Sequence, residues 1–336
     1  MKDVTVVILN WNGRDLLEKF LPSVLASTYD KAEIWVADNG SKDDSVAFVK
    51  SQFPTIKVVE LGENYGFAEG NNRAVELVET PYTILLNSDV EVDANWIGPL
   101  VSVLENNPEI AAVQPKIRSY HNKEYFEYAG AAGGMMDKLG YPFCRGRVFT
   151  HIEKDEGQYE EPADIFWASG ACCAIRTSVI REIGLFDGAY FAHMEEIDFC
   201  WRALNHGYRV VYEPQSLVFH VGGGTLDYAN PRKTFLNVRN SLATLMKNLP
   251  QGQVLPKIFT RLILDGIWGI SLLLRGQFGG LWAIIRAHFA FYGRIGEYRA
   301  FRRQAYETPP RAFPTSGFLN ESLVWKCFVK GRRIGQ

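Results

Sequence analysis

Residues 82–96 read YTILLNSDVEVDANW and join a short apolar run to two carboxylates. Residues 83–86 have the composition of a buried strand, and Asp89 and Glu91 follow this strand closely. Carboxylates two residues apart in a loop can both turn toward one hard cation, and Mg²⁺ or Mn²⁺ prefers such oxygen ligands together with substrate phosphates. A solvated acidic turn is the alternative interpretation, but the position at a strand end favours a metal site.

The N-terminal sequence alternates apolar strand-like runs with amphipathic helix-like runs. We expect strands at residues 5–9, 33–37, 56–61 and 82–86, and helices at 14–27, 43–53 and 70–78. This alternation predicts an α/β fold with a mostly parallel sheet flanked by helices on both faces. Ligands of such sheets bind beyond the carboxyl ends of the strands, where Asn10, Asp38 and Asp89 fall.

The pattern becomes less regular after about residue 105. Glycine-rich loops are expected at 130–134 and 140–147, a strand and helix at 174–180, a helix at 197–205, and short strands at 210–212 and 217–219. From residue 231 the sequence changes to long, basic and aromatic helical segments. We therefore predict a catalytic domain over residues 1–230 and a helical C-terminal region over 231–336.

Charge is distributed unevenly between these two parts. The chain of 336 residues has a net charge of −2, but residues 231–336 hold 17 Lys and Arg against 4 Asp and Glu, a net of +13. Such a basic region suits an anionic membrane surface. Its apolar stretches, 266–274 and 281–292, are shorter than the roughly 20 residues of a spanning helix. Packing onto the protein and a homodimer interface remain the alternatives, and nucleic acid is not expected because no recognised binding module is present.

The cysteines and the N-terminus bear on location. The five cysteines are scattered without a C-x-x-C pair, so neither a zinc site nor a disulfide framework is expected. The chain enters a strand at once and carries no signal-peptide pattern. These features predict a cytoplasmic protein, with a peripheral position on the inner face of the plasma membrane left open.

Seven separated blocks give the sequence a specific resemblance to glycosyltransferase family 2, over roughly residues 3–250. The blocks are NWN (10–12), ADNGS (37–41), ENYGFAEGNN (63–72), LLNSDVEV (85–92), ASGACCAIR (168–176), FDGAYFAHMEEIDFCWRALNHGYRVVYEP (186–214) and LVFH (217–220). The resemblance implies the Rossmann-like GT-A fold. Within the family the sequence looks most like the bacterial rhamnosyltransferase-like branch, which builds cell-surface polysaccharides.

This resemblance implies a donor site made from several of the blocks. Asn10 and Trp11 would line the nucleotide base, and Asp38 would accept a hydrogen bond from its N3–H group. Gly66 and Asn72 would lie near the ribose and diphosphate. The ordinary alternatives are a core aromatic for Trp11, a helix cap for Asp38, and turn chemistry for Gly66 and Asn72.

The metal site implied by the family consists of Asp89, Glu91 and His220. Glu91 departs from the usual second aspartate, which keeps the charge but lengthens the side chain. A lone histidine such as His220 is otherwise an ordinary core or surface residue. Trp167 and Gly170 match the acceptor side, where a Trp face can stack on a sugar ring, although core packing is an equal interpretation of Trp167.

The general base implied by the family lies in the acidic block 195–198. Glu196 occupies the position of the base, where the family usually has aspartate, and Glu195 is the alternate candidate. Asp198 completes the block, but it also lies four residues before Arg202 and is positioned for a helix ion pair.

Together these features imply an inverting, metal-dependent transfer. The donor would be a nucleoside-diphosphate sugar, dTDP-rhamnose or a UDP-sugar, and the acceptor a glycan or lipid-linked glycan. A polyprenyl-phosphate glycosyltransferase is one alternative, and a non-catalytic sugar-nucleotide or glycan-binding scaffold is another. Nucleotidyltransferase activity is weaker, because it would leave block 195–198 and His220 without a role.

Overall fold

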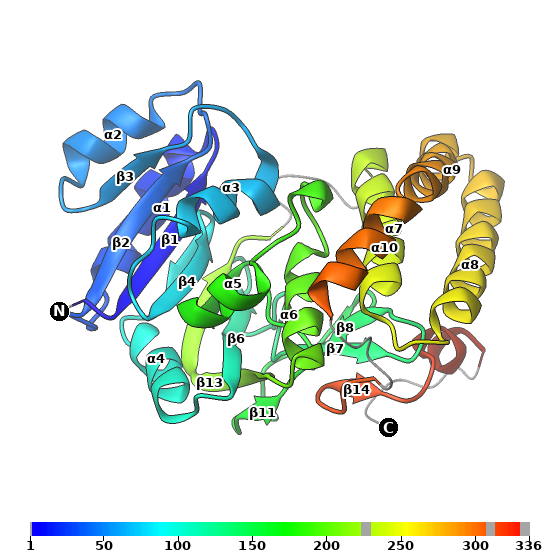
Figure 1. The fold of residues 1–336 in the computed structure, drawn as a ribbon. Helices are drawn as coiled ribbons and strands as arrows, with labels where there is room; N and C mark the ends of the chain where they lie inside the picture. The colour runs from blue at the N-terminus through cyan, green and yellow to red at the C-terminus, as the bar shows by residue number, and fades with distance from the viewer. Residues whose placement is uncertain (1, 223–229, 307–312, 330–336) are drawn as a thin grey trace.

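A computed structural model describes residues 2–222, 230–306 and 313–329 of the chain, and Figure 1 shows its fold. The helices are α1 (Arg14–Leu25), α2 (Ser45–Gln52), α3 (Gly66–Val75), α4 (Ile97–Asn106), α5 (Thr177–Ile183), α6 (Glu195–Asn205), α7 (Pro231–Asn248), α8 (Val254–Leu274), α9 (Phe278–Gly293) and α10 (Ile295–Ala305). The strands are β1 (Val4–Asn10), β2 (Ala32–Asp38), β3 (Lys57–Glu60), β4 (Tyr82–Asn87), β5 (Val90–Val92), β6 (Ile110–Ser119), β7 (Gly134–Asp137), β8 (Pro142–Cys144), β9 (Arg147–Val148), β10 (His151–Ile152), β11 (Ala163–Asp164), β12 (Cys172–Arg176), β13 (Arg209–His220) and β14 (Phe318–Leu319).

The main sheet has nine strands in the order β11-β13-β6-β12-β4-β1-β2-β3, with β5 paired to β13. Strands β3, β2, β1 and β4 are parallel, which confirms the α/β fold predicted from the N-terminal alternation. Strand β12 runs antiparallel to both of its neighbours. The register pairs Asn10 with Asp38 and Leu9 with Asn87, so the carboxyl ends of β1, β2 and β4 form one edge.

Helices cover both faces of this sheet, because alternate residues of each strand point to opposite sides. Val6 and Ile8 of β1 belong to a buried cluster with residues of α1, α2 and α4. Val7, between them, belongs to the other cluster, which includes residues of α3, α5 and α6. The alternation thus fixes the sheet between two apolar layers, and the polar strand ends emerge together at its edge.

Two expectations for the middle of the chain were wrong. The segments 130–134 and 140–147 are not only loops, since they contain the first residue of β7, all of β8 and the first residue of β9, which belong to a second, five-stranded sheet in the order β10-β9-β8-β7-β14. The two short strands expected at 210–212 and 217–219 are one strand, β13, with an irregular register between Glu213 and Leu217. Short strands that pair with distant partners leave little local periodicity, which explains the first error, and the polar stretch EPQS (213–216) at the irregular register explains the second.

The C-terminal region is helical as expected, and it packs against the catalytic part. Helix α7 contacts α6 on one side and α8, α9 and α10 on the others (Figure 1). Beyond α10, β14 pairs with β7 of the small sheet. In the described part of the chain, no helix is long and apolar enough to cross a membrane. The predicted region also contains 307–312 and 330–336, which lie outside the described residues.

Candidate active site

The edge formed by β1 and β2 holds a buried polar pair. Asn10 and Asp38 are the last residues of their strands, and the Asn10 amide donates to the Asp38 carboxylate at 3.1 Å. The backbone N–H of Ser41 donates to the other Asp38 oxygen at 3.0 Å. The structure therefore brings two predicted base-binding residues together and fixes the carboxylate of Asp38, which still has free lone pairs for another donor.

Trp11 lies directly beside this pair and is 50% exposed, so the alternative of a core aromatic is wrong. The next residue, Asn12, has a left-handed φ of 50°. Its conformation is stabilised at both ends, because its N–H donates to the Ser41 hydroxyl at 2.9 Å and its side chain accepts from Lys42 N–H at 2.7 Å. An exposed indole on a rigid loop can provide a flat face for a nucleotide base.

The segment that carries Gly66 is tied to the same edge through Asn39. The Asn39 amide donates to the Gly66 carbonyl at 2.9 Å and accepts from the Tyr65 N–H at 3.1 Å. Gly66 has φ of +79°, and a Cβ there would lie 2.5 Å from the ring of Phe191. Only glycine fits this conformation and this contact. Helix α3 begins at Gly66, four residues before the predicted start.

Asn72 is on α3, but its amide is used by a different loop. Its Nδ2 donates to the Phe186 carbonyl at 2.8 Å, and its Oδ1 accepts from the Phe186 N–H at 3.0 Å. These two bonds fix the start of the loop that leads to α6. The predicted contact of Asn72 with the donor stays a prediction, and the second lone pair of its Oδ1 is available for such a contact.

Asp89 and His220 meet where β5 pairs with the end of β13. The His220 Nε2 lies 3.2 Å from the Asp89 carboxylate, and its Nδ1 lies 3.4 Å from that of Glu127. Burial alone would lower the pKa of His220, but the hydrogen bonds and charges of these two carboxylates outweigh burial and raise it to about 10. Glu127 was not predicted, and it holds the far side of the imidazole as carboxylates do behind metal-binding histidines.

Glu91, the other predicted ligand, points elsewhere and forms an ion pair with Lys123. No three His, Cys, Asp or Glu side chains among the described residues form a ready metal cluster. Asp89 still suits Mg²⁺ or Mn²⁺, because such ions are often held by one or two protein ligands together with substrate phosphates, and His220 can join it once a bound cation displaces the proton from its Nε2. The residues present therefore fit a metal that is completed by the donor diphosphate.

The two predicted acceptor residues lie in different surroundings. Trp167 is only 4% exposed, and its indole N–H donates to the Met135 carbonyl at 2.9 Å. Gly170 lies near the acidic block, because a Cβ added there would be 4.0 Å from the Cβ of Glu196 and 3.5 Å from the ring of Phe67. An acceptor-side role fits the position of Gly170 more directly than the buried position of Trp167.

Glu195 and Glu196 occupy the first turn of α6, and each has one carboxylate oxygen that is buried without a hydrogen-bond partner. Burial raises the pKa of Glu196 to about 7. Burial, reinforced by the charge of Glu196, raises the pKa of Glu195 well above its usual range. A carboxyl that titrates near neutral pH with a free oxygen is the form that general-base catalysis needs, and Glu196 has both features.

The loop before these glutamates is held in an unusual conformation. Phe191, His193 and Met194 have φ values of 66°, 70° and 74°, which non-glycine residues rarely adopt. Asn240 of α7 donates to three carbonyls of this loop, those of Tyr190 (3.1 Å), Ala192 (2.9 Å) and His193 (2.7 Å). Strain of this kind persists only where the surroundings enforce it, and α7 supplies that enforcement.

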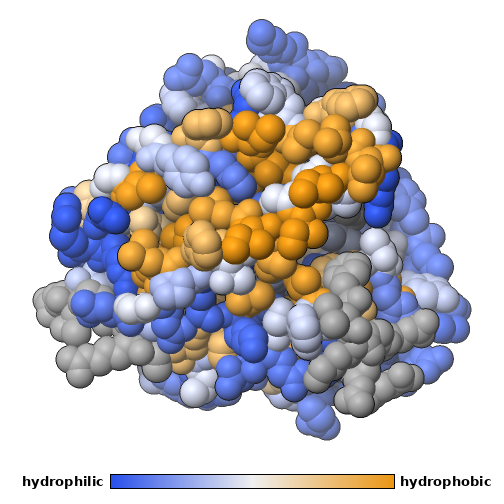
Figure 2. All heavy atoms as spheres, turned by 90° about the vertical axis from the view of Figure 1, so that its right-hand side faces the viewer, coloured by the Kyte–Doolittle hydropathy of each residue, from blue (hydrophilic) through white to orange (hydrophobic). Residues whose placement is uncertain are grey.

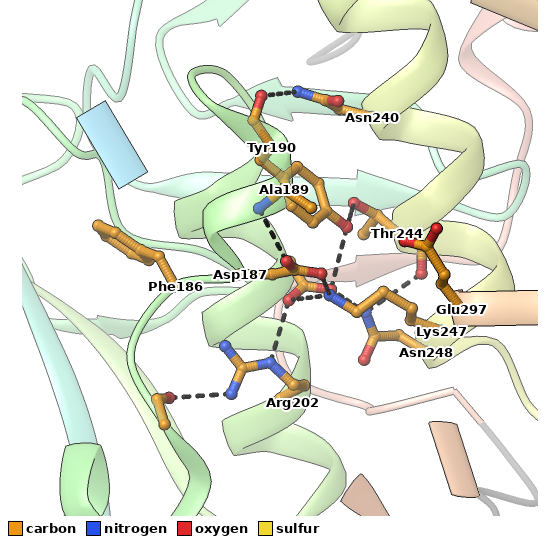
Figure 3. Close-up of polar contacts among 12 residues, drawn as sticks. Phe186, Asp187, Ala189, Tyr190, Arg202, Asn240, Thr244, Lys247, Asn248 and Glu297 are labelled. Carbon is orange, nitrogen blue, oxygen red and sulfur yellow. Dashed lines mark hydrogen bonds and ion pairs between the residues drawn. The ribbon is translucent and has the colours of Figure 1, made fainter. Parts of the chain in front are cut away.

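Asp198, two residues after Glu196, is fully buried and lies at the centre of a network of hydrogen bonds and ion pairs. Its carboxylate accepts from Lys247 at 2.8 Å, Arg202 at 3.0 Å and Asn248 at 2.7 Å. Figure 3 shows Arg202, Lys247 and Asn248 converging between α6 and α7, with Tyr190 above them. Burial alone would raise the pKa of Asp198, but Lys247 and Arg202 lower it below its usual value.

This network corrects the expectation of a simple helix pair. The Asp198–Arg202 pair exists, but both side chains are buried and Lys247 of α7 joins them. Lys247 also lies 3.1 Å from Asp187, in the loop before α6. The network therefore links helices from both sides of the predicted boundary at residue 230, and the division into two domains stays a prediction.

Comparisons with known proteins identify the family. The model of "Glycosyl transferase family 2" matches residues 5–184, more than half of the chain. The N-acetylglucosaminyl-diphospho-decaprenol L-rhamnosyltransferase of Mycobacterium tuberculosis is 28% identical over 236 residues, which cover 66% of this chain and 76% of that protein.

Solved structures share the fold. A structure of GalNAc-T7 with UDP, GalNAc and Mn²⁺ has a TM-score of 0.59 at 21% identity and covers 74% of this chain and 48% of that one. The mannosyltransferase PcManGT of Pyrobaculum calidifontis, in complex with GDP-Man and Mn²⁺, has a TM-score of 0.52 at 15% identity and covers 90% and 89%. Both of these structures contain a divalent metal together with a nucleotide.

Proposed function

The chain belongs to glycosyl transferase family 2 and is a glycosyltransferase, and we propose that it moves a sugar from dTDP-rhamnose or a UDP-sugar to a glycan or lipid-linked glycan with inversion. The observation that carries this proposal is the convergence of Asn10, Asp38 and Asp89 at one edge of the sheet. The M. tuberculosis relative, which is named as a rhamnosyltransferase acting on a decaprenol-linked sugar, supports the choice of donor and acceptor.

The donor nucleotide would lie against the edge of β1 and β2. Trp11 offers an exposed flat face to the base, and Asp38 offers a fixed carboxylate oxygen to its N3–H. Asp89 and His220 would hold Mg²⁺ or Mn²⁺, and Glu91 would join them once its ion pair with Lys123 opens. When such an ion is bound, its charge offsets the negative charge that develops on the departing nucleoside diphosphate.

Glu196 would act as the general base at the acceptor side. Its free oxygen takes the proton from the acceptor hydroxyl while that oxygen forms a bond to the anomeric carbon. The bond from the anomeric carbon to the diphosphate oxygen breaks in the same step, and its electron pair leaves with the nucleoside diphosphate. A single displacement inverts the anomeric centre without a covalent enzyme intermediate.

A peripheral place on the inner face of the plasma membrane follows from the same proposal, because a lipid-linked acceptor would be reached there. The net charge of +13 over residues 231–336 supports such a location.

The test is donor hydrolysis and transfer across a panel of sugar nucleotides with Mn²⁺, with and without a chelator. Asp89→Asn should lower turnover by roughly 10²-fold or more, because the diphosphate loses charge stabilisation. The matched control is Asp93→Asn, an exposed carboxylate four residues further along the chain. Full wild-type activity in chelator would show that the proposed metal dependence is wrong.

A further inference from the structure

The outward faces of α8 and α9 form a broad apolar surface. Twelve of the eighteen large hydrophobic side chains that are exposed among the described residues lie between residues 255 and 292, so the exposure is concentrated and not scattered. We name this set the α8–α9 face; it consists of Leu255, Phe259, Ile263, Ile267, Trp268, Ile270, Leu273, Leu274, Phe278, Trp282, Phe289 and Tyr292. Figure 2 shows the hydrophobic surface on this side of the molecule.

The spacing of these residues indicates an ordered face. On α8, positions 255, 259, 263, 267, 270 and 274 recur every three or four residues along one side of the helix. The opposite sides of the two helices supply buried residues, such as Ile258 and Leu272 on α8 and Ala287 and Phe291 on α9. Packing within the protein therefore covers only one side of each helix, and the other side is exposed.

The charges around this face are basic. Residues 254–293, all described, contain a single acid, Asp265, which is buried and lies 3.1 Å from the His288 ring. Arg275, which directly follows α8, and Arg286 of α9 are exposed. An apolar face with exposed arginines and without an exposed acid is complementary to a partner that has an apolar interior and anionic groups at its surface.

An anionic bilayer fits these observations better than a second copy of the chain. Trp268, Trp282 and Tyr292 are amphipathic aromatics of the kind enriched at membrane interfaces. A two-fold contact would place the same face on both copies, so Arg275 and Arg286 would enter an interface to which residues 254–293 bring no exposed acid. We propose that the α8–α9 face lies in the interfacial plane of an anionic lipid bilayer.

Contact with the bilayer would bring the active site to a lipid-linked acceptor, and only this role of the contact rests on the proposed function. The experiment is flotation of the full chain with vesicles of phosphatidylcholine alone or with added phosphatidylglycerol. The apolar variant is Phe259→Gln/Ile267→Gln, the charge variant is Arg275→Gln/Arg286→Gln, and the control is Leu77→Gln, which removes an exposed leucine elsewhere. Donor hydrolysis and circular dichroism of each variant are measured in parallel.

We expect the wild type to float with the anionic vesicles, and increasing salt to weaken its binding. The apolar variant should lower vesicle partition by at least about tenfold, since two large apolar side chains are lost from the interface. The charge variant should lose the preference for anionic vesicles, and Leu77→Gln should behave as the wild type.

The inference is overturned if the wild type ignores both vesicle types, or if the apolar variant binds them as the wild type does. A concentration-dependent dimer that the apolar variant abolishes, without vesicle binding, would assign the face to a second copy. Vesicle binding in a chain that neither hydrolyses nor transfers any donor would keep the membrane inference and refute the proposed function instead.

Discussion

The first turn of α6 and the interface between α6 and α7 place acidic residues in opposite electrostatic situations. Glu196 has a buried oxygen without a partner, and burial raises its pKa to about 7. Asp198 is even more deeply buried, but Lys247 and Arg202 keep its pKa below the usual value. The two carboxylates are separated by one residue. Their cationic partners, and not burial alone, therefore decide which of them can exchange a proton near neutral pH.

This contrast assigns different functions to neighbouring residues. The α6–α7 interface fixes the helix by pairing the carboxylate of Asp198, whereas the first turn of α6, which follows the strained loop, keeps carboxylate oxygens without a partner. The C-terminal region therefore contributes to the site by positioning α6 and the loop before it, although it contains none of the residues predicted to bind the sugar donor.

The largest expected effect comes from removing the unsatisfied carboxylate. Glu196→Gln keeps the shape of the side chain but cannot accept a proton, so the transfer rate should fall by about 10²–10⁴-fold. The donor KM should remain close to that of the wild type, because the base contacts the acceptor hydroxyl. Steady-state kinetics with saturating acceptor measure both quantities.

Glu195→Gln is the matched control for this prediction. If Glu195→Gln alone is inactive and Glu196→Gln transfers sugar at the wild-type rate, the base is Glu195 and the assignment is shifted by one residue.

Removing the charge of Asp198, the carboxylate that has its partners, should lower stability instead. Asp198→Asn leaves Arg202 buried without its carboxylate partner and Lys247 with Asp187 as its remaining one, and we expect the free energy of unfolding to fall by about 3–5 kcal/mol. Urea denaturation measures the change. Arg209→Gln, which breaks exposed ion pairs with Glu109 and Asp164, serves as the control and should cost less than about 1 kcal/mol. Equal small losses in both variants would contradict the structural role of Asp198.

A smaller effect is expected from the helix that holds the strained loop. Asn240→Asp removes the donor that contacts the carbonyls of Tyr190, Ala192 and His193, which should shift Glu196 from its position. We expect kcat to fall by roughly 10- to 100-fold with little change in donor KM, because small misplacements of a catalytic group are costly. Asn237→Asp, on an exposed part of α7, is the control. A fall in stability without a change in kcat would limit Asn240 to a structural role.

The N-terminal sheet and its edge could be predicted from the sequence because their signals are local. Apolar runs followed by Asn10, Asp38 and Asp89 give both the strands and their polar ends. The structure pairs Asn10 with Asp38 in register, and Asp89 lies two residues beyond the paired Asn87 of β4. The family and the α/β fold were confirmed. The contacts of Trp11 and Asp89 with a donor stay predictions, since their position and not their ligand is what the structure describes.

The residues that sequence reasoning missed act over long separations. Lys247 lies 49 residues from Asp198, and Asn240 lies 47 residues from His193, so no motif or periodicity connects them. Glu127 follows an irregular segment and carries no local signal of its contact with His220. The small sheet was missed for the same reason, because β14 pairs with β7 across most of the C-terminal region.

The pH dependence of kcat/KM for the acceptor is the most direct test of Glu196 as the proton-accepting carboxylate. A base must be deprotonated to act, and burial raises the pKa of Glu196 in the unliganded protein to about 7, so kcat/KM should rise with pH through that value and then level off. Glu196→Gln should remove the rising limb, and Asp198→Asn should retain it if the variant is folded. A wild-type profile that is flat through neutral pH, or a rising limb that persists in Glu196→Gln, would contradict the assignment.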